Sequence, residues 1–519
     1  MDSTTVAFKA LPPAILAWFL WCLARRFVFS HPLDKIRGPS NPSLLTDDGV
    51  MRVFGPFKKR SLFIQDPKAM HHIFIKDQDI FEETTSFLAW VTSFGSSRSR
   101  VNGLVIRVNK AVFGDGLLSI LASQFFDVTY KLRGVLSRKT AGGPEEIDFM
   151  NWVTRAALEI VAQSGFGTTW DPISEDHSEH PFITSAKLLG PVGRKLLLFR
   201  AFVMPIVYKW DFGVPGFYRF LISIFPSKSL HKLRDITDTM HSISLQLFNE
   251  KKEALAKGSG TFKNDHKDIL SILMEANAKA SNEDRLPDNE VIAQISTFTF
   301  AAMDTTSSAL CRIFWLLARH QDVQDKLRAE IREAKLNFDE PNYDQLAGLP
   351  YLDGVCRETL RLYPPVSTLS RQARRDVVLP LSKPVKTVDG KYIQEIHVPK
   401  DTVVFASLLG SNTNPELWGP DTYEWKPERW MSPIPDAVVE ARIPGVYSHL
   451  MTFIGGGRAC IGFKFSQMEM KAIIYVLIDA FKFSLPKQEI LWTMGGLSTP
   501  SIDPNQLKPN MPLVVSGAE

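Results

Sequence analysis

One segment is too long and too apolar to fit into a small domain. From Asp288 to His320 the residues follow a helical pattern, and Asp288, after Pro287, is the expected N-cap. Such a helix is about 45–50 Å long, which is enough to cross a whole domain. Its middle, residues 295–317, is apolar nearly all round. We therefore expect it to be buried at the centre of a large helical core.

The segments around this helix predict a mainly α-helical protein with small β-sheets. Two short apolar runs, 51–55 and 61–65, predict a β-hairpin, and Asp66 is the expected cap of the short helix that follows. Further helices are expected at 322–334, 351–363 and 463–483. The first of these alternates in charge and is expected on the surface, and the second is stopped by Pro364 and Pro365.

Composition excludes several classes of protein. The chain has 519 residues, with 60 Lys and Arg against 56 Asp and Glu, a net charge of +4. This near balance argues against a protein that coats nucleic acid, so we expect no nucleic-acid partner. Hydrophobic residues make up 45% of the chain, which excludes wholesale disorder. Four cysteines cannot form a disulfide scaffold and indicate a reducing compartment.

The amino terminus carries an apolar run. No residue from Ala10 to Ala24 is charged, and Arg25 and Arg26 follow. Near the end of a helix these arginines can extend toward lipid headgroups, so residues 1–30 are interpreted as a single-pass membrane anchor. A cleaved signal peptide is the alternative, but no small-x-small cleavage site follows the run. Basic residues on the C-terminal side predict that the rest of the chain faces the cytoplasm.

A glycine-rich loop around one cysteine carries the most chemical information. It runs from Phe453 to Gly462 as FIGGGRACIG and leads into an apolar helical segment. A cysteine at a helix N-terminus feels the positive end of the dipole, which predicts a lowered pKa and a thiolate. Arg458 is placed to meet an acidic group on the same ligand. A structural cysteine is the alternative, whereas a phosphate loop fails because Phe463 stands where that motif needs Lys.

This loop resembles the heme-binding loop of the cytochrome P-450 monooxygenases, Phe-x-x-Gly-x-Arg-x-Cys-x-Gly. The matching positions are Phe453, Gly456, Arg458, Cys460 and Gly462. The resemblance implies heme b, an iron-protoporphyrin IX, with Cys460 as the axial ligand of the metal. An axial thiolate pushes electron density onto iron and promotes cleavage of the O–O bond.

Two further stretches match the family and imply a scaffold. Glu358 and Arg361 lie three residues apart, hence on one helix face, and a surface pair is the alternative reading. In the family this pair is buried and completed by an Arg from a Pro-Glu-Arg segment, which makes Arg429 the third member here. Losing one partner of such a network strands a buried charge.

The long helix carries a segment similar to the family's oxygen-activation motif, at residues 301–306. The resemblance assigns proton delivery to Asp304 and Thr305, a general-acid task. The alternative is a threonine bonded back to its own helix beside a salt-bridged aspartate. Ala302 stands where the family usually has Gly, which adds a methyl group where the helix normally loosens.

The residues that would contact the heme propionates match the family less completely. Arg371 matches a position that contacts a heme propionate, with an ordinary surface arginine as the alternative. The family's Trp-x-x-x-Arg is expected just after Gly114–Ser119, and it is missing there. The chain leaves little room at this point for the helix that carries it. We therefore expect an atypical or imperfectly spliced member, with weaker heme binding on its propionate side.

The resemblance also implies the architecture and the reaction. It predicts one large P-450 domain at 44–519, joined by a hinge at 31–43 to the membrane anchor. It implies monooxygenation of a lipophilic substrate such as a terpenoid, steroid or polycyclic aromatic, in secondary metabolism or xenobiotic oxidation. Electrons would come from NADPH through NADPH-cytochrome reductase, which could meet Lys464, at the endoplasmic reticulum membrane. The alternatives are a heme-thiolate isomerase or peroxygenase and a degenerate, non-catalytic membrane protein.

Overall fold

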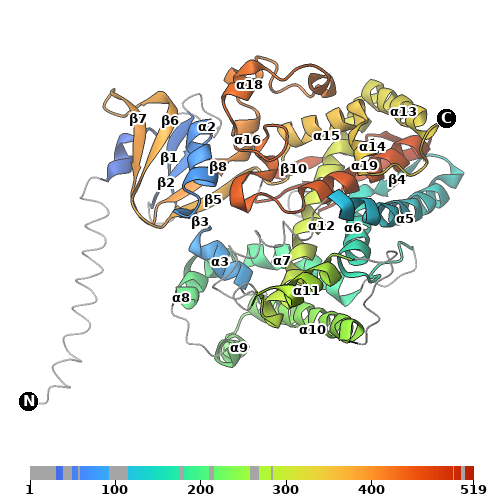
Figure 1. The fold of residues 1–519 in the computed structure, drawn as a ribbon, viewed down its shortest axis with the longest axis horizontal. Helices are drawn as coiled ribbons and strands as arrows, with labels where there is room; N and C mark the ends of the chain where they lie inside the picture. The colour runs from blue at the N-terminus through green and yellow to red at the C-terminus, as the bar shows by residue number, and fades with distance from the viewer. Residues whose placement is uncertain are drawn as a thin grey trace, which may run out of the picture.

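The computed structural model describes residues 31–38, 49–55, 59–92, 115–174, 180–209, 215–256, 268–281, 285–494, 496–503 and 509–518. In these residues the protein is mainly helical, with four small sheets (Figure 1). The anchor expected at 1–30 and residues 39–43 of the hinge lie outside the described residues. Among the helices that are described, none is both long and apolar enough to cross a bilayer.

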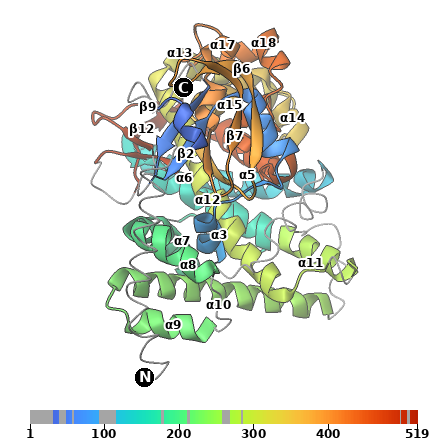
Figure 2. The ribbon, with the colours of Figure 1, turned by 90° about the vertical axis from the view of Figure 1, so that its left-hand side faces the viewer.

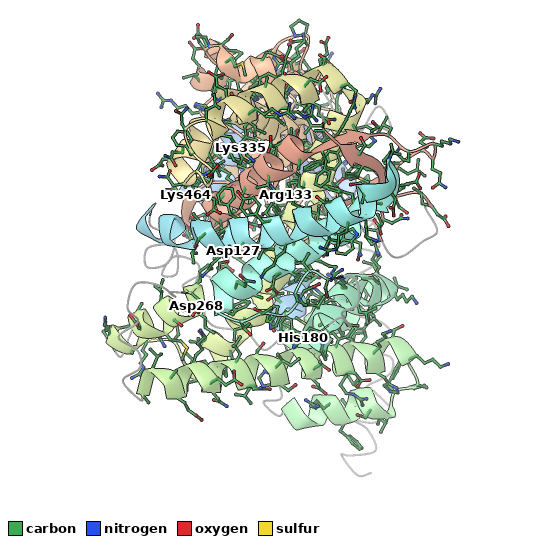
Figure 3. All side chains as sticks on the ribbon, turned by 90° about the vertical axis from the view of Figure 1, so that its right-hand side faces the viewer. Asp127, Arg133, His180, Asp268, Lys335 and Lys464 are labelled. Carbon is green, nitrogen blue, oxygen red and sulfur yellow. The ribbon has the colours of Figure 1, made fainter. Side chains whose placement is uncertain are left out.

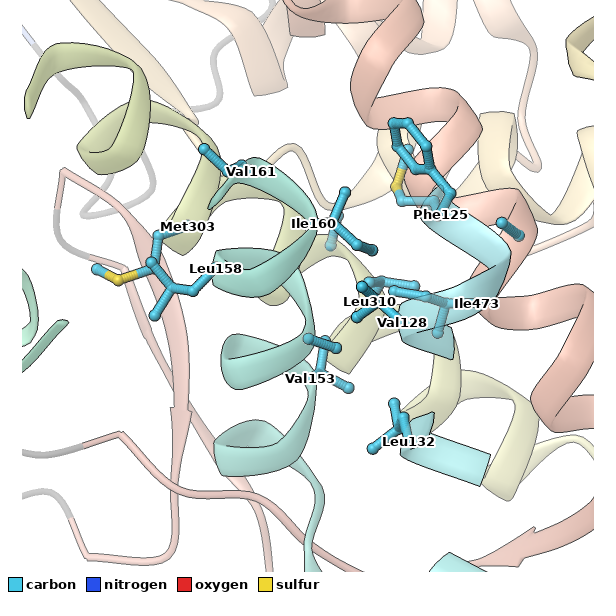
Figure 4. Packing of buried hydrophobic residues seen from close by; sticks show 14 of the residues in the cluster. Phe125, Val128, Leu132, Val153, Leu158, Ile160, Val161, Met303, Leu310 and Ile473 are labelled. Carbon is cyan, nitrogen blue, oxygen red and sulfur yellow. The ribbon is translucent and has the colours of Figure 1, made fainter. Parts of the chain in front are cut away.

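The helix α12 (Asp288–Arg319) runs through the middle of the fold. Against it and one another pack α5 (Asp115–Lys139), α6 (Phe149–Ile160) and α19 (Phe463–Ala480). Figure 4 shows this packing, in which Leu310 of α12 lies among aliphatic side chains of the neighbouring helices. The expected central, buried helix is therefore present.

Several helix boundaries differ from the sequence expectation. Pro287, and not Asp288, is the N-cap of α12; Asp288 is its first residue, where an acid still favours the helix dipole. The last helix ends at Ala480, because the chain then turns into strand β9 (Phe481–Ser484). Residues 115–139 form one continuous helix, and its sequence contains no Trp-x-x-x-Arg. The expectation that the chain has little room for a separate helix with that motif after Gly114–Ser119 stays a prediction.

Two helices beside α12 fall close to their expected places. The helix expected at 322–334 is α13 (Gln321–Lys335), and it is not wholly on the surface, since one face is buried with Leu327 and Arg328. The helix expected at 351–363 is α15 (Pro350–Leu362), which ends before the two prolines. Both prolines lack an N–H group and cannot continue the helical hydrogen-bond ladder.

The predicted hairpin forms one edge of the largest sheet. Strand β1 (Val50–Phe54) pairs antiparallel with β2 (Arg60–Ile64), and the sheet continues through β8 (Val403–Ser407), β5 (Thr368–Ala373) and β3 (Phe81–Glu82). Asp66 caps α2 (Pro67–His71) as predicted, by accepting a hydrogen bond from the Ala69 amide at 2.9 Å. This sheet and α2 belong to a second cluster of buried apolar residues, separate from the one around α12.

In the view of Figure 2, a group of further helices lies below α12. The long helix α10 (Lys228–Ala256) packs against α7 (Pro181–Lys195), and α8 (Met204–Lys209) and α9 (Pro215–Ile224) lie near them. The remaining helices are η1 (Pro32–Lys35), η3 (His72–Lys76), α3 (Thr85–Thr92), η4 (Thr140–Gly142), η5 (Val161–Gly165), η6 (Phe199–Val203), α11 (Ile269–Lys279), α14 (Tyr343–Ala347), α16 (Leu408–Asn412), α17 (Pro415–Trp418), η7 (Pro427–Met431), α18 (Asp436–Glu440), η8 (Met451–Phe453) and η9 (Gly456–Arg458). The remaining strands are β4 (Glu145–Asp148), β6 (Val377–Lys386), β7 (Tyr392–Val398), β10 (Leu491–Met494), β11 (Ser498–Ser501) and β12 (Pro512–Gly517).

Candidate active site

The cysteine loop is held by its own backbone and by a segment that is distant in the sequence. The Cys460 amide donates to the Phe453 carbonyl at 2.9 Å, which closes the loop just before α19. Phe453 packs edge-on against Tyr447, with ring centroids 5.8 Å apart. The Gly457 amide donates to the Gln78 side chain at 2.9 Å, which ties the loop to the segment after η3.

The glycines of the loop differ in how strictly the structure requires them. Gly456 has a φ of +76°, and a Cβ there would lie 2.2 Å from the Phe74 carbonyl oxygen. Any other residue would therefore clash with backbone as well as strain the turn. At Gly462 a Cβ would meet no protein atom within 4 Å. Packing against the described residues therefore does not demand glycine at position 462.

The Cys460 side chain is accessible, although protein atoms surround it closely. Burial raises the pKa of this thiol to about 11, and the Gly462 amide, which donates to the sulfur, lowers it only in part. The expectation that the helix dipole alone makes Cys460 a thiolate is therefore wrong. Cys460 lies three residues before the first residue of α19, beyond the first turn where the dipole acts. A coordinated metal ion, by contrast, deprotonates a thiol outright.

The central turns of α12 are less buried than the turns on either side of them. Residues 290–296, 306–314 and 316–318 are buried, whereas Phe300 is 36% exposed and Ala301 is exposed as well. The expectation that residues 295–317 are buried all round is therefore wrong for these turns. Ala302, Asp304 and Thr305 are half-buried on the same stretch. Accessible apolar side chains in the middle of a core helix are typical of a ligand cavity.

Asp304 is an acid in a poorly solvated place. Burial raises its pKa to about 6, although the positive charges of Lys187 and Arg194 on α7 act in the opposite direction. Both the protonated and the ionised form are therefore populated near neutral pH. A group of this kind suits proton transfer, since a general acid works best when its pKa is close to the operating pH.

Thr305 donates its hydroxyl hydrogen to the Ala301 carbonyl at 2.8 Å. Thr299 and Ser307 on the same helix make the same kind of bond, so the back-bond itself does not distinguish Thr305. The partial exposure of Thr305 does distinguish it, because Thr299 and Ser307 are buried. The next residue, Thr306, is buried and lies close to Glu469 of α19.

Arg371 and Arg458 converge on one carboxylate. Arg371 Nη2 lies 3.6 Å from Glu83 Oε1, and Arg458 Nη1 lies 3.2 Å from Glu83 Oε2. Arg371 is on β5 and Arg458 is on η9, so the sheet and the cysteine loop meet at Glu83. The Arg371 side chain is only 7% exposed, which shows that it is not an ordinary surface arginine.

The structure brings Glu358, Arg361 and Arg429 into one buried network. Arg361 donates to both carboxylate oxygens of Glu358, at 2.8 and 2.9 Å, and neither side chain is exposed. Arg429 Nε donates to Glu358 Oε1 at 3.2 Å, and the Trp430 indole donates to Oε2 at 3.0 Å. Glu358 therefore accepts hydrogen bonds on both oxygens, and the alternative of a surface pair is excluded.

The outer side of this network is anchored as well. Arg361 Nη1 lies 3.2 Å from both the Asn412 carbonyl and the Thr422 hydroxyl. Arg429 donates to a carboxylate oxygen of Asp421 at 3.1 Å and to its backbone carbonyl at 3.0 Å. The hydrogen bond from Arg429 lowers the pKa of Asp421 to about 2, with Lys426 adding to the effect.

Comparisons with known proteins agree with this geometry. Residues 49–507 match the family described as Cytochrome P450. The chain is 43% identical to cytochrome P450 monooxygenase 91 of Postia placenta, over 96% of this chain and 97% of that protein. The chain belongs to the cytochrome P450 family.

Other relatives span nearly the same length. The chain is 39% identical to the ganoderic acid synthetase CYP5150L8 of Ganoderma lucidum, over 99% of each chain. It is 41% identical to cytochrome P450 monooxygenase 219 of Postia placenta, over 90% of this chain and 86% of that protein. This chain is a cytochrome P450 monooxygenase.

The P450 family implies a thiolate-ligated heme, and the residues present fit that group. Cys460 offers an accessible sulfur, and the accessible turns of α12 supply an apolar wall. Each guanidinium has five N–H donors. Among the described residues, Arg371 donates one recorded hydrogen bond, to the Ser370 carbonyl, and Arg458 donates one, to the Phe81 carbonyl. Both keep donors for the carboxylates of a ligand.

Sequence reasoning missed three residues of this P450 site. Glu83 lies in an irregular stretch, and no pattern there marks it as the partner of two distant arginines. Trp430 directly follows Arg429 in the sequence, but nothing local indicates that its indole reaches Glu358. Glu469 could have been found, because an acid in an otherwise apolar helix is costly to bury and therefore informative.

Proposed function

We propose that this monooxygenase holds heme b through Cys460 and oxidises a lipophilic, terpenoid-like substrate at the accessible turns of α12. The observation that carries the proposal is the accessible Cys460 sulfur, surrounded by protein, in a chain whose central helix is also accessible at its middle turns. An accessible sulfur that is surrounded by protein is suited to be the axial ligand of a heme iron.

Each residue has a defined task in this proposal. Cys460 supplies the sulfur ligand, and the Gly462 amide stabilises negative charge on that sulfur. Arg458 and Arg371 supply N–H donors for the heme propionates. When bound, the heme supplies the reductive activation of O₂ that no side chain can supply. One oxygen atom enters the substrate and the other leaves as water, with two electrons from NADPH and two protons.

Asp304 and Thr305 are proposed to handle those protons. The raised pKa of Asp304 allows its carboxyl group to hold a proton near neutral pH and release it readily. Thr305 can pass a proton through its hydroxyl when its bond to the Ala301 carbonyl opens. The extra methyl group of Ala302 stiffens this turn and is expected to tune the coupling of electron use to product formation.

The substrate class is proposed from the wall of the site and from one relative. Phe298, Phe300, Ala301 and Ala302 offer apolar surface, which suits a lipophilic molecule. The Ganoderma relative is named for ganoderic acid, a terpenoid. A terpenoid of secondary metabolism is therefore the substrate class that we favour over a steroid or a polycyclic aromatic.

Electrons are proposed to come from NADPH-cytochrome reductase. The face near the cysteine loop carries Lys464 at the second position of α19 (Figure 3). A basic side chain there suits an acidic surface on the reductase. This route distinguishes the proposed reaction from that of a peroxygenase or isomerase, neither of which needs a reductase.

Location at the endoplasmic reticulum membrane is proposed from apolar surface as well as from residues 1–30. Large apolar side chains are exposed on and around η6, α8 and α9: Leu197, Leu198, Phe202, Val203, Ile206, Val207, Phe220, Leu221, Ile224 and Phe225. Exposed apolar patches of this kind mark contact with a membrane or a partner. A lipid surface would also bring the enzyme close to its lipophilic substrate.

The experiment is a carbon monoxide difference spectrum of the reduced full-length protein and of Cys460→Ala. We expect the band of thiolate-ligated heme in the wild type and its loss in the variant. In the same preparation, a terpenoid ligand should shift the heme spectrum, and turnover should require NADPH and reductase. Cys356→Ala is the matched control, since Cys356 is a buried cysteine on helix α15, and its removal should leave the band in place.

Each part of the proposal can fail separately. A band that survives in Cys460→Ala would show that another residue is the ligand. A wild type without the band would support the degenerate protein instead. Full turnover with peroxide alone, and none with reductase, would support a peroxygenase.

A further inference from the structure

The two arginines assigned to the propionates share a carboxylate of the protein itself. Glu83 lies between β3 and α3, and its side chain is 12% exposed. It faces Arg371 from the sheet and Arg458 from the cysteine loop, which are 7% and 14% exposed. Three ionisable groups from three separate segments therefore meet in a poorly solvated place.

The contacts of Glu83 are incomplete. Its Oε2 atom is buried and has no hydrogen-bond partner among the described residues, although Arg458 Nη1 lies 3.2 Å away. The 3.6 Å separation from Arg371 to Oε1 exceeds a hydrogen bond. The arginines are held instead by backbone: Arg371 by the Ser370 carbonyl and Arg458 by the Phe81 carbonyl. Glu83 therefore offsets the positive charge of the two arginines without occupying their N–H donors.

The charges of this cluster do not balance. Two guanidiniums and one carboxylate carry a net charge of +1, and burial makes an uncompensated charge costly. One ligand carboxylate would bring the sum to zero, and a second would bring it to −1. The cluster is thus built for a single carboxylate of a bound ligand.

We propose that Glu83 is a positioning residue of the heme site, whose negative charge offsets that of Arg371 and Arg458 and limits them to one propionate. This inference rests on the proposed heme function. Without a ligand, Glu83 keeps the two guanidiniums from facing each other uncompensated. With the heme bound, the same negative charge lies near the propionates and lowers the reduction potential of the iron, since negative charge favours the ferric state.

The test is Glu83→Gln in the heme-loaded, full-length protein. The amide keeps the size of the side chain but removes its charge, so the cluster attracts propionates more strongly. We expect heme transfer to excess apomyoglobin to slow by roughly ten-fold, the effect of one unit charge at short range in a partly shielded site. We also expect the midpoint potential of the iron to move to more positive values.

Two variants control for structural damage. Glu82→Gln changes the neighbouring acid, which pairs with Arg374 at 2.8 Å and does not touch the two propionate arginines. It should leave both the heme-transfer rate and the potential at the wild-type values. Glu83→Asp keeps the charge and should stay close to the wild-type potential. Since the potential is read only from protein that contains heme, partial misfolding of a variant does not hide the result.

The possible results separate this inference from the proposed function. If wild type shows the thiolate heme band and Glu83→Gln matches it in both transfer rate and potential, the role of Glu83 is overturned while the heme function stands. Faster heme loss in Glu83→Gln would likewise overturn it, because the charge would then be helping the propionates to bind. If wild type takes up no heme, the proposed function itself fails.

Discussion

Two clusters in this protein contain the same groups and are built differently. Each has one glutamate and two arginines. Around Glu358, both carboxylate oxygens accept hydrogen bonds, and Arg361 is wholly buried. Around Glu83, one oxygen has no hydrogen-bond partner among the described residues, and both arginines keep donors.

The difference teaches how to tell a scaffold from a ligand site. A buried polar network that is fully satisfied stabilises one conformation and has nothing left to offer a ligand. In the Glu358 network Asp421 supplies a second carboxylate, which pairs with Arg429. A cluster with two arginines, one carboxylate and unused donors can be completed by a ligand. By this criterion, the Glu358 network is a scaffold, and the Glu83 cluster has the unused donors that our proposal assigns to a heme propionate.

The largest effect should come from breaking the satisfied cluster. Arg361→Leu leaves Glu358 buried with only Arg429 as a charged partner and strands the hydrogen bonds made to Asn412 and Thr422. Breaking a buried ion pair from one side costs about 3–5 kcal/mol. A whole domain is stable by only about 5–15 kcal/mol. We expect a large drop in the urea midpoint of unfolding, followed by circular dichroism.

Arg371→Leu is the matched comparison from the incomplete cluster. Glu83 keeps Arg458 at 3.2 Å in this variant, so the loss of stability should be clearly smaller than for Arg361→Leu. Its main effect should be on the retention of heme. Equal losses of stability in the two variants would remove the distinction between the clusters.

Local parts of the site could be predicted from sequence. Phe453, Arg458 and Cys460 lie in one contiguous string, so their spacing already specifies the loop. The position of Arg429 beside Glu358 was predicted only through the family resemblance, because 71 residues separate the two along the chain. The central helix was predicted by its apolar length.

What could not be predicted depends on surroundings that the sequence does not display. Phe300 and Ala301 look like core residues, since side chains that line an apolar cavity and those that fill a core are of the same types. The thiol of Cys460 was expected to ionise from its place near a helix, but it lies before the first turn of α19 and burial raises its pKa. Glu83 and Arg371 meet only because the strands β3 and β5 pair.

Glu469 extends the comparison to a carboxyl group with even fewer partners. It is fully buried, and its two oxygens have no hydrogen-bond partner among the described residues, although Thr306 lies close enough to lower its pKa in part. Burial raises the pKa of Glu469 well above the usual value. The folded protein therefore keeps this proton at a pH where the unfolded chain has lost it.

Replacing this acid should change how stability depends on pH. Above the pKa of the unfolded glutamate, the wild type loses up to about 1.4 kcal/mol of stability per pH unit through this group. Glu469→Gln removes that loss, so urea unfolding at several pH values should show a flatter dependence and a gain that grows toward neutral pH. Glu440→Gln, at an exposed glutamate, is the control. An unchanged slope in Glu469→Gln would mean that Glu469 is ionised in the folded protein.

The smallest effect is expected at the outer edge of the satisfied cluster. Arg429 and Lys426 lower the pKa of Asp421 to about 2, below its value in the unfolded chain. The unfolded state therefore binds this proton first as the pH falls, and the stability that Asp421 contributes is present above about pH 4 and lost toward about pH 2. The side chain is 33% exposed, so screening limits the contribution to about 1 kcal/mol or less. Asp421→Asn should accordingly be slightly less stable than wild type at pH about 5, and the difference should vanish in acid. A difference that is constant with pH would show that Asp421 acts through hydrogen-bond geometry and not through its charge.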